Sequence, residues 1–222
     1  MSSKKQEHEP HHKKDGKKDE STKYFIIAVG IVILVLAAMI VSSKYIFKNT
    51  NKVEYNNYVF TKNEYNKWDV QQQIRGEVYN IEFHYNPKEV LDIPVDHNAI
   101  TRLRNFSYYP NTTVYITVDP QESSMVVLAG IEYARILGTT YNVYNMNVKS
   151  AISQAVDLEA GPPVITCEDA SKDTFVVYQT VTDKNLVSIE GNCIILESSS
   201  ANESVRVADA FTYRLLNIIH DW

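Results

Sequence analysis

Glycine is scarce in this chain, which has only seven glycines and seven prolines among 222 residues. Glycine-rich loops that cradle phosphates need closely spaced glycines, and neither a P-loop nor a G-x-G-x-x-G motif is present. The motifs H-E-x-x-H, G-x-S-x-G and paired C-x-x-C, which mark zinc proteases, serine hydrolases and metal or redox thiols, are missing too. The sequence therefore predicts no catalytic residue and no cofactor, and the missing motifs favour a protein that is not an enzyme.

Basic residues are in short supply after the first fifth of the chain. From Lys44 onward there are 15 Lys and Arg against 22 Asp and Glu, a net charge near −7. A nucleic-acid partner requires a basic face that meets its phosphates. We therefore expect no nucleic-acid partner.

Charged side chains are absent from the twenty positions between Lys23 and Lys44, and nearly all of these positions are apolar. Twenty helical residues span about 30 Å, the thickness of the hydrocarbon core of a bilayer. A cleaved signal peptide would have a shorter apolar region of about 7–15 residues, and a soluble core helix is rarely apolar all round. Of these three alternatives we expect the permanent one, a single transmembrane helix at residues 23–46.

Lysines flank this apolar run unequally. Seven precede its first apolar residue, whereas only Lys44, Lys48 and Lys52 follow it closely. Positive flanks stay on the cytoplasmic side. We expect a single-pass protein of the cytoplasmic (plasma) membrane, with the lipid bilayer as a partner, its N-terminus inside and its C-terminal domain outside.

The remaining chain divides by composition. Residues 1–22 have no apolar side chain beyond Met1 and are predicted to form a disordered cytoplasmic tail, because they cannot bury enough surface to offset ordering entropy. Residues 47–54 are predicted to be a linker. Strand patterns dominate 55–110, and strands alternate with helices in 111–222, so we expect a β-rich subdomain followed by an α/β subdomain.

Periodicity sets the expected fold class. "EVYNIEFHY" alternates with period two and places Ile81 and Phe83 on one face and His84 on the other, with "YNNYVFTK" and "KWDVQQQI" as antiparallel neighbours. "DHNAITRLRNF" suits a helix capped by Asp96. Further strands are expected at "TTVYITVDP", "YNVYNMNV", "PVITC", "TFVVYQTV" and "LVSIEGNCIILE", with helices at "ESSMVVLAGIEYARILG", "SAISQAVDLEA" and "NESVRVADAFTYRLLNII". The fold class is therefore α+β, with a mixed-sheet α/β sandwich.

The chain has two cysteines, Cys167 and Cys193. Outside the cell, an even count of two indicates a disulfide, which would stabilise the fold by roughly 3 kcal/mol in the chain-entropy model. Two buried reduced thiols are the alternative. No His or Asn is placed by the sequence to activate either thiol for catalysis.

Three Asn-x-Ser/Thr sequons follow the apolar run, at Asn105, Asn111 and Asn202. They are glycosylation candidates if the domain is external. An Asn-rich chain also produces sequons by chance, and Asn202 equally suits the N-cap of the last helix.

Two further clusters have a weak functional signal. Phe106, Tyr108 and Tyr109 in "NFSYYPN" suit a contact surface for a partner or glycan, or else pack under their loop. The carboxylates in "CEDASKD" are weak candidates for a metal site, because the same pattern is typical of a turn. These carboxylates belong to Glu168, Asp169 and Asp173.

Several segments together resemble uncharacterised single-pass membrane proteins of archaea with an extracytoplasmic α/β domain. The resemblance covers about residues 55–219 and rests on "YNNYVFTK", Trp68, "HYNPKEVLDIPV", "ITVDP", "VITCEDA", "EGNCIIL" and "VADAFTYRLLNII". It implies that Cys167 and Cys193 are partners and that the setting is an S-layer-type envelope. It implies no activity.

The expected function is that of a membrane-anchored extracytoplasmic binding or structural protein, with an envelope component or a membrane protein as its partner. An anchored hydrolase-like ectoenzyme is one alternative. A pilin-like assembly subunit is another, although the leader lacks a Gly-type processing site and the helix lacks an acidic residue near its start. The sequence predicts no oligomeric state.

Overall fold

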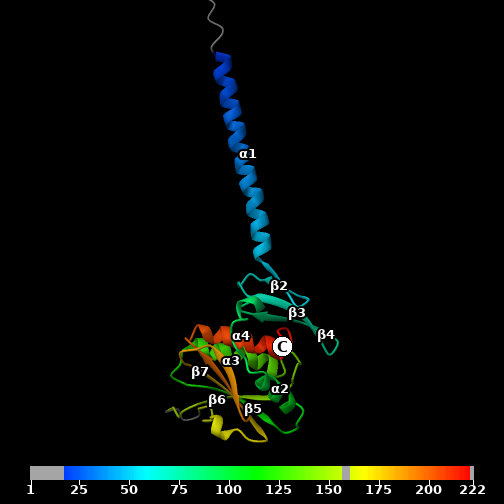
Figure 1. Ribbon diagram of the computed structural model, residues 1–222, viewed down its shortest axis with the longest axis vertical. Helices are drawn as coiled ribbons and strands as arrows, with labels where there is room; N and C mark the ends of the chain where they lie inside the picture. The colour runs from blue at the N-terminus through cyan, green and yellow to red at the C-terminus, as the bar shows by residue number, and fades with distance from the viewer. Residues whose placement is uncertain (1–17, 157–160, 221–222) are drawn as a thin grey trace, which may run out of the picture. The chain divides into compact units, whose positions relative to one another are not determined.

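The computed structural model describes residues 18–156 and 161–220 (Figure 1). The chain forms two compact units that divide between Thr50 and Asn51. The predicted disordered tail lies outside the described residues up to residue 17, and its last residues belong to the first helix.

The first unit is one helix, α1 (Lys18–Thr50), which is longer than the predicted span and takes in part of the predicted linker. Within it, Thr22–Ser42 is long and apolar enough to cross a membrane, and its most apolar part is not buried within the protein. Its large apolar side chains are exposed, from 43% for Val29 to 71% for Leu34. The helix is therefore not the core helix of a soluble domain.

The second unit begins with a four-stranded antiparallel sheet in the order β1-β2-β3-β4. The alternating pattern predicted the last three strands, whereas β1 lies mostly in the predicted linker 47–54. Its strands are β1 (Lys52–Tyr55), β2 (Tyr58–Lys62), β3 (Trp68–Ile74) and β4 (Glu77–Phe83). Ile81 and Phe83 are buried on one face, whereas Val78 is 65% exposed on the other. Period-two alternation thus identified the core face of β4 correctly.

Asparagine forms many of the turns that glycine forms elsewhere. Among the described residues other than glycine, eight have a positive φ, and seven of them are Asn: Asn56, Asn57, Asn66, Asn111, Asn142, Asn145 and Asn217. Asn tolerates this left-handed region better than other residues with a side chain. The exception is Arg75, which with Gly76 forms the tight turn between β3 and β4.

A five-stranded mixed sheet follows, in the order β6-β5-β7-β9-β8. All neighbouring strands are parallel except the edge strand β8. The strands are β5 (Thr113–Val118), β6 (Asn147–Ile152), β7 (Thr174–Val181), β8 (Leu186–Glu190) and β9 (Cys193–Ser198). The fold class α+β is confirmed.

Helices α2 (His97–Phe106), α3 (Ser124–Leu137) and α4 (Glu203–Leu215) belong to this unit, and in Figure 1 α3 and α4 lie between the two sheets. The ring of Tyr213 on α4 stacks on Phe83 at 4.1 Å and meets Phe60 edge-on at 5.7 Å. On its other flank, Phe211 contacts Tyr133 of α3. One hydrophobic core therefore joins both sheets, across the predicted boundary at residue 110.

Three predicted elements differ in the structure. Of the strand expected at "YNVYNMNV", only the last two residues belong to a strand, as the start of β6. A helix was expected at 150–160, but residues 150–152 form the end of strand β6 because they pair in parallel with β5. Residues 157–160 lie outside the described part. "PVITC" forms only one bridge, between Val164 and Ile152, before the short helix η2 (Cys167–Asp169). The residues that follow β6 and the segment "PVITC" both belong to the connection from β6 to β7.

This connection crosses one face of the mixed sheet. Helix α3 joins β5 to its neighbour β6. The connection from β6 passes β5 to reach β7, so it runs across the sheet in the opposite direction. Because crossovers between parallel strands are right-handed, α3 and the connection lie on opposite faces of the sheet. Side chains alternate along β9, so Cys193 points away from the core residue Ile194 and toward the connection.

Candidate functional site

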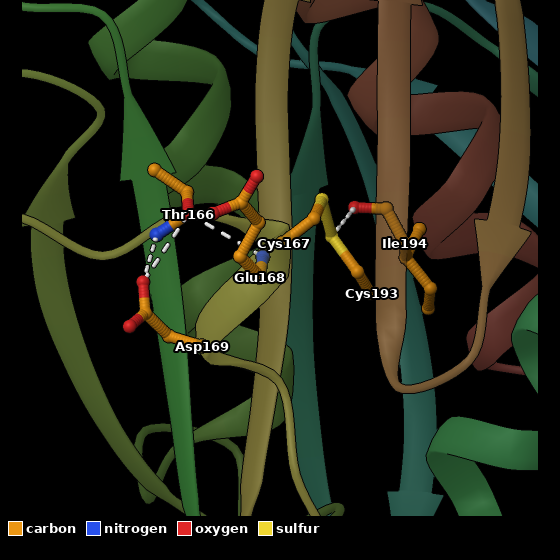
Figure 2. Close-up of a disulfide and its surroundings, with 6 residues drawn as sticks. All are labelled: Thr166, Cys167, Glu168, Asp169, Cys193 and Ile194. Carbon is orange, nitrogen blue, oxygen red and sulfur yellow. Dashed lines mark hydrogen bonds between the residues drawn. A yellow bond between two sulfur atoms is a disulfide. The ribbon is translucent and has the colours of Figure 1, made fainter.

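The disulfide predicted from the cysteine count joins Cys167 of η2 to Cys193 of β9 (Figure 2). The two Cα atoms are 5.2 Å apart and the cysteines are 26 residues apart in the chain. The bridge therefore fastens the β6–β7 connection to the sheet, and the alternative of two reduced thiols is wrong for this structure.

The acidic residues beside the disulfide shape the turn. Thr166 accepts a hydrogen bond from the amide of Glu168, and Asp169 Oδ2 accepts one from the amide of Thr166 at 2.8 Å (Figure 2). This is a capping box, so the carboxylate of Asp169 stabilises the short helix. In the part of the chain that the structure describes, no group of three His, Cys, Asp or Glu is placed to hold a metal ion.

A chain of hydrogen bonds leads from this turn to α2. Asn192, next to Cys193, donates from Nδ2 to the carbonyl of Ser171 at 2.6 Å. Its Oδ1 accepts a hydrogen bond from Nε of Arg102 at 2.8 Å. The disulfide and Asn192 together therefore fix Arg102 against the segment that contains Lys172 and Asp173.

These segments enclose a cavity of about 560 Å³, within the range of small-ligand sites. Its wall combines two cations, one carboxylate, amides and two aromatic rings. The lining residues include Arg102, Asn105, Tyr109, Lys172, Asp173 and Asn192. This cavity is the candidate binding site.

The predicted aromatic contact surface is only partly right. Tyr108 is 83% exposed and Tyr109 is 64% exposed, and Tyr109 lines the cavity. Phe106 also lines the cavity, but it is a core residue, 4% exposed, whose ring packs on Phe175 with the centroids 5.1 Å apart. Helical spacing explains the error, because Phe106 continues the buried face of α2 that contains Leu103.

The three sequons differ in their surroundings. Asn105 and Asn111 are exposed near the cavity, and Asn105 lines it. Asn202 is exposed at the N-cap of α4, but its side chain makes no capping hydrogen bond. The serine of that sequon, Ser204, is fully buried, and its hydroxyl is engaged with that of Ser198. Glycosylation stays a prediction at all three positions.

A second group of charges surrounds Glu132 on α3. Its carboxylate lies 3.2 Å from His84 Nε2, 3.2 Å from Arg135 Nη1 and 3.8 Å from Lys67 Nζ. Burial acts to raise the pKa of Glu132, but the hydrogen bond with His84 and the charges of Lys67 and Arg135 outweigh it, so the pKa is lowered. This cluster ties the antiparallel sheet to the helix layer.

Asp209 lies below this cluster on α4, with 1% of its surface exposed. Its Oδ2 accepts hydrogen bonds from the amides of His84 and Tyr85 at 2.9 and 2.8 Å. Burial raises the pKa of Asp209 well above its ordinary value, although these amides oppose the shift. Asp209 therefore pairs with backbone N–H groups of the segment that follows β4.

Sequence reasoning missed the two cations of the cavity and Asn192. It did single out four of the eight residues that line the cavity, namely Asn105, Phe106, Tyr109 and Asp173. Arg102, Lys172 and Asn192 come from three distant segments, and none belongs to a motif. The partnership of His84 with Glu132 was missed for the same reason. Comparison with known protein families, curated proteins and solved structures finds no match. The resemblance to archaeal membrane proteins therefore stays a prediction.

Proposed function

We propose that this chain is a single-pass membrane protein whose domain from residue 51 onward lies outside the cytoplasmic membrane and binds an envelope component. The observation that supports it most is the segment Thr22–Ser42, which is apolar on every side and has no protein contact that buries it. Fully burying each Val, Leu or Ile side chain is worth about 1.5–3 kcal/mol, and a bilayer supplies that burial.

Two properties of the domain favour the outside. The domain contains the Cys167–Cys193 disulfide. Disulfides persist in oxidising compartments and are rare in the cytosol. The lysines before the span outnumber those that follow it closely, which keeps the N-terminus inside. The S-layer-type setting implied by the resemblance agrees with this orientation.

The cavity beside Arg102 favours binding as the activity. Its polar groups come from the helix, the connection and the β8–β9 hairpin, and the disulfide braces them. Such a preorganised concave site with a few fixed polar groups is typical of ligand recognition.

An anchored hydrolase is the second candidate, because His84 and Glu132 form a pair that resembles a general base with its orienting carboxylate. However, Lys67 and Arg135 also contact Glu132, so the pair sits in a saturated ion cluster. Pilin-like assembly stays a prediction from the sequence.

Protease protection of the full chain tests the topology. The chain is expressed in bacterial cells with a C-terminal epitope, and protease is added to right-side-out and to inverted membrane vesicles. We expect loss of the epitope only in right-side-out vesicles, and alkylation of Cys167 only after reduction.

The matched control changes the span alone. Leu34→Arg with Leu36→Arg places two charges at the helix centre, each costing about 2.5–3.5 kcal/mol on an insertion scale, so the protein should leave the membrane fraction. Loss of the epitope from inverted vesicles instead, or a wild-type chain extracted by carbonate, would contradict the proposal.

A further inference from the structure

Arg102 presents an anion-binding group to the cavity. Its Nε donates to Asn192 Oδ1, which fixes the plane of the guanidinium. Among the residues that the structure describes, no carboxylate forms an ion pair with Arg102. The terminal Nη groups therefore remain for a ligand, and their fork geometry matches a carboxylate.

Lys172 and Asp173 set the local charge. Their side chains pair at 3.7 Å but are 89% and 63% exposed, so the pair is weak and the ammonium remains accessible. With Arg102, the wall has two cations and one carboxylate within a domain of net negative charge. This balance suits a ligand with single negative charges rather than a polyphosphate.

The rest of the wall suits a sugar ring. Tyr109 is 64% exposed and offers a ring face beside Pro110, and Asn105 and Asn192 bring amide groups that can bond to hydroxyls. Aromatic faces combined with amide groups give a wet, polar surface that needs little reorganisation on binding.

We propose that this cavity binds an acidic saccharide, with the carboxylate of a hexuronate residue on Arg102 and Lys172 and its ring on Tyr109. The inference deepens the proposed binding function and rests on it for the biological setting. The disulfide has a direct part, because it holds the turn that leads to Lys172 and the strand that follows Asn192.

Calorimetric titration of the full chain in nanodiscs tests the proposal. The probes are a tetra-galacturonate, a neutral tetrasaccharide of the same length and inorganic phosphate. We expect saturable binding of the galacturonate alone. Arg102→Ala and Tyr109→Ala should each weaken it about tenfold or more, since each removes a charge-assisted fork or the ring platform.

Matched variants control for charge and for exposed aromatic surface. Arg75→Ala and Tyr65→Ala remove an exposed Arg and an exposed Tyr outside the cavity, and both should bind as the wild type does. Arg102→Lys should retain part of the affinity, because the charge stays while the fork is lost. The unfolding midpoint of each variant is measured in parallel, so that loss of binding is distinguished from loss of folding.

The proposal is overturned if the wild type binds the neutral and acidic saccharides equally, if phosphate competes with the galacturonate for the cavity, or if no saturable binding occurs. It is overturned equally if Arg75→Ala weakens binding as much as Arg102→Ala. None of these results affects the vesicle experiment, so failure of the ligand class is distinguishable from failure of the membrane topology.

Discussion

Helices α1 and α4 contrast in what they bury. Helix α1 is apolar over Thr22–Ser42, yet its side chains are exposed. Helix α4 contains Asp209, Thr212 and Arg214, and all three are buried. The burial of a helix therefore depends on the elements packed against it and not on its own hydrophobicity alone. Two sheets enclose α4, whereas the apolar side chains of α1 stay exposed.

The polar groups of α4 tolerate burial because most have partners. Arg214 donates to the carbonyls of Ala210 and Ile93, at 3.1 and 3.4 Å. Asp209 accepts from two amides at the end of β4. A buried polar group costs free energy only where such bonds are missing. Substitutions at specific side chains should therefore change the free energy of unfolding differently in the two helices.

The largest expected effect comes from truncating one apolar side chain in each of the two helices. Phe211→Ala removes a fully buried ring and should lower the free energy of unfolding by about 3–5 kcal/mol, from lost burial and a new cavity. Leu34→Ala, on a side chain 71% exposed, should change it by less than about 0.5 kcal/mol. Urea unfolding of both variants in detergent measures the difference, and equal losses would contradict it.

Asp209 should show the next largest effect. Asp209→Ala leaves the amides of His84 and Tyr85 without an acceptor and should cost about 2–4 kcal/mol. Asp209→Asn keeps an acceptor and removes the buried charge, so its cost should be much smaller.

The pH dependence of Asp209 has a defined sign. Because burial raises the pKa of Asp209 in the folded state, its ionisation opposes folding as pH rises above the unfolded value of 3.8. Unfolding at pH 4.5 and 7 should show Asp209→Asn gaining on the wild type at the higher pH. If the difference in unfolding free energy between Asp209→Asn and the wild type did not change with pH, the pKa of Asp209 would not be raised in the folded state, which would contradict this prediction.

Glu132 should give the smallest effect. Glu132→Gln weakens its contacts with Lys67, Arg135 and His84 and should cost about 1–2 kcal/mol near neutral pH. Because the pKa of Glu132 is lowered in the folded state, this stability is present above the ordinary value of 4.5 and is lost as pH falls through the lowered pKa. Unfolding from pH 7 to 3.5 should show the gap closing below about 4.5. Glu64→Gln, at an exposed position, should show no gap at any pH.

The sequence predicted those elements that local signals specify. Asp96 caps α2, and Ser123 and Gly138 bound α3, because a cap depends on a few neighbouring residues. It failed at 150–160, where the end of β6 is fixed by pairing with β5 rather than by its own composition. The aromatic and Asn105 side of the cavity was predicted as a candidate surface, but its cationic side was out of reach for the same reason. Arg102, Lys172 and Asn192 meet only after the whole sheet has assembled.

The asparagines at left-handed turn positions have a consequence for the denatured chain. Glycine would adopt the same backbone at no steric cost, but it also frees the unfolded chain to sample more conformations. A residue with a side chain at such a position restricts that freedom, an effect worth about 0.4–1 kcal/mol where the native backbone is compatible. Seven such asparagines restrict the unfolded chain of this domain, so part of its stability arises in a state that no folded contact describes.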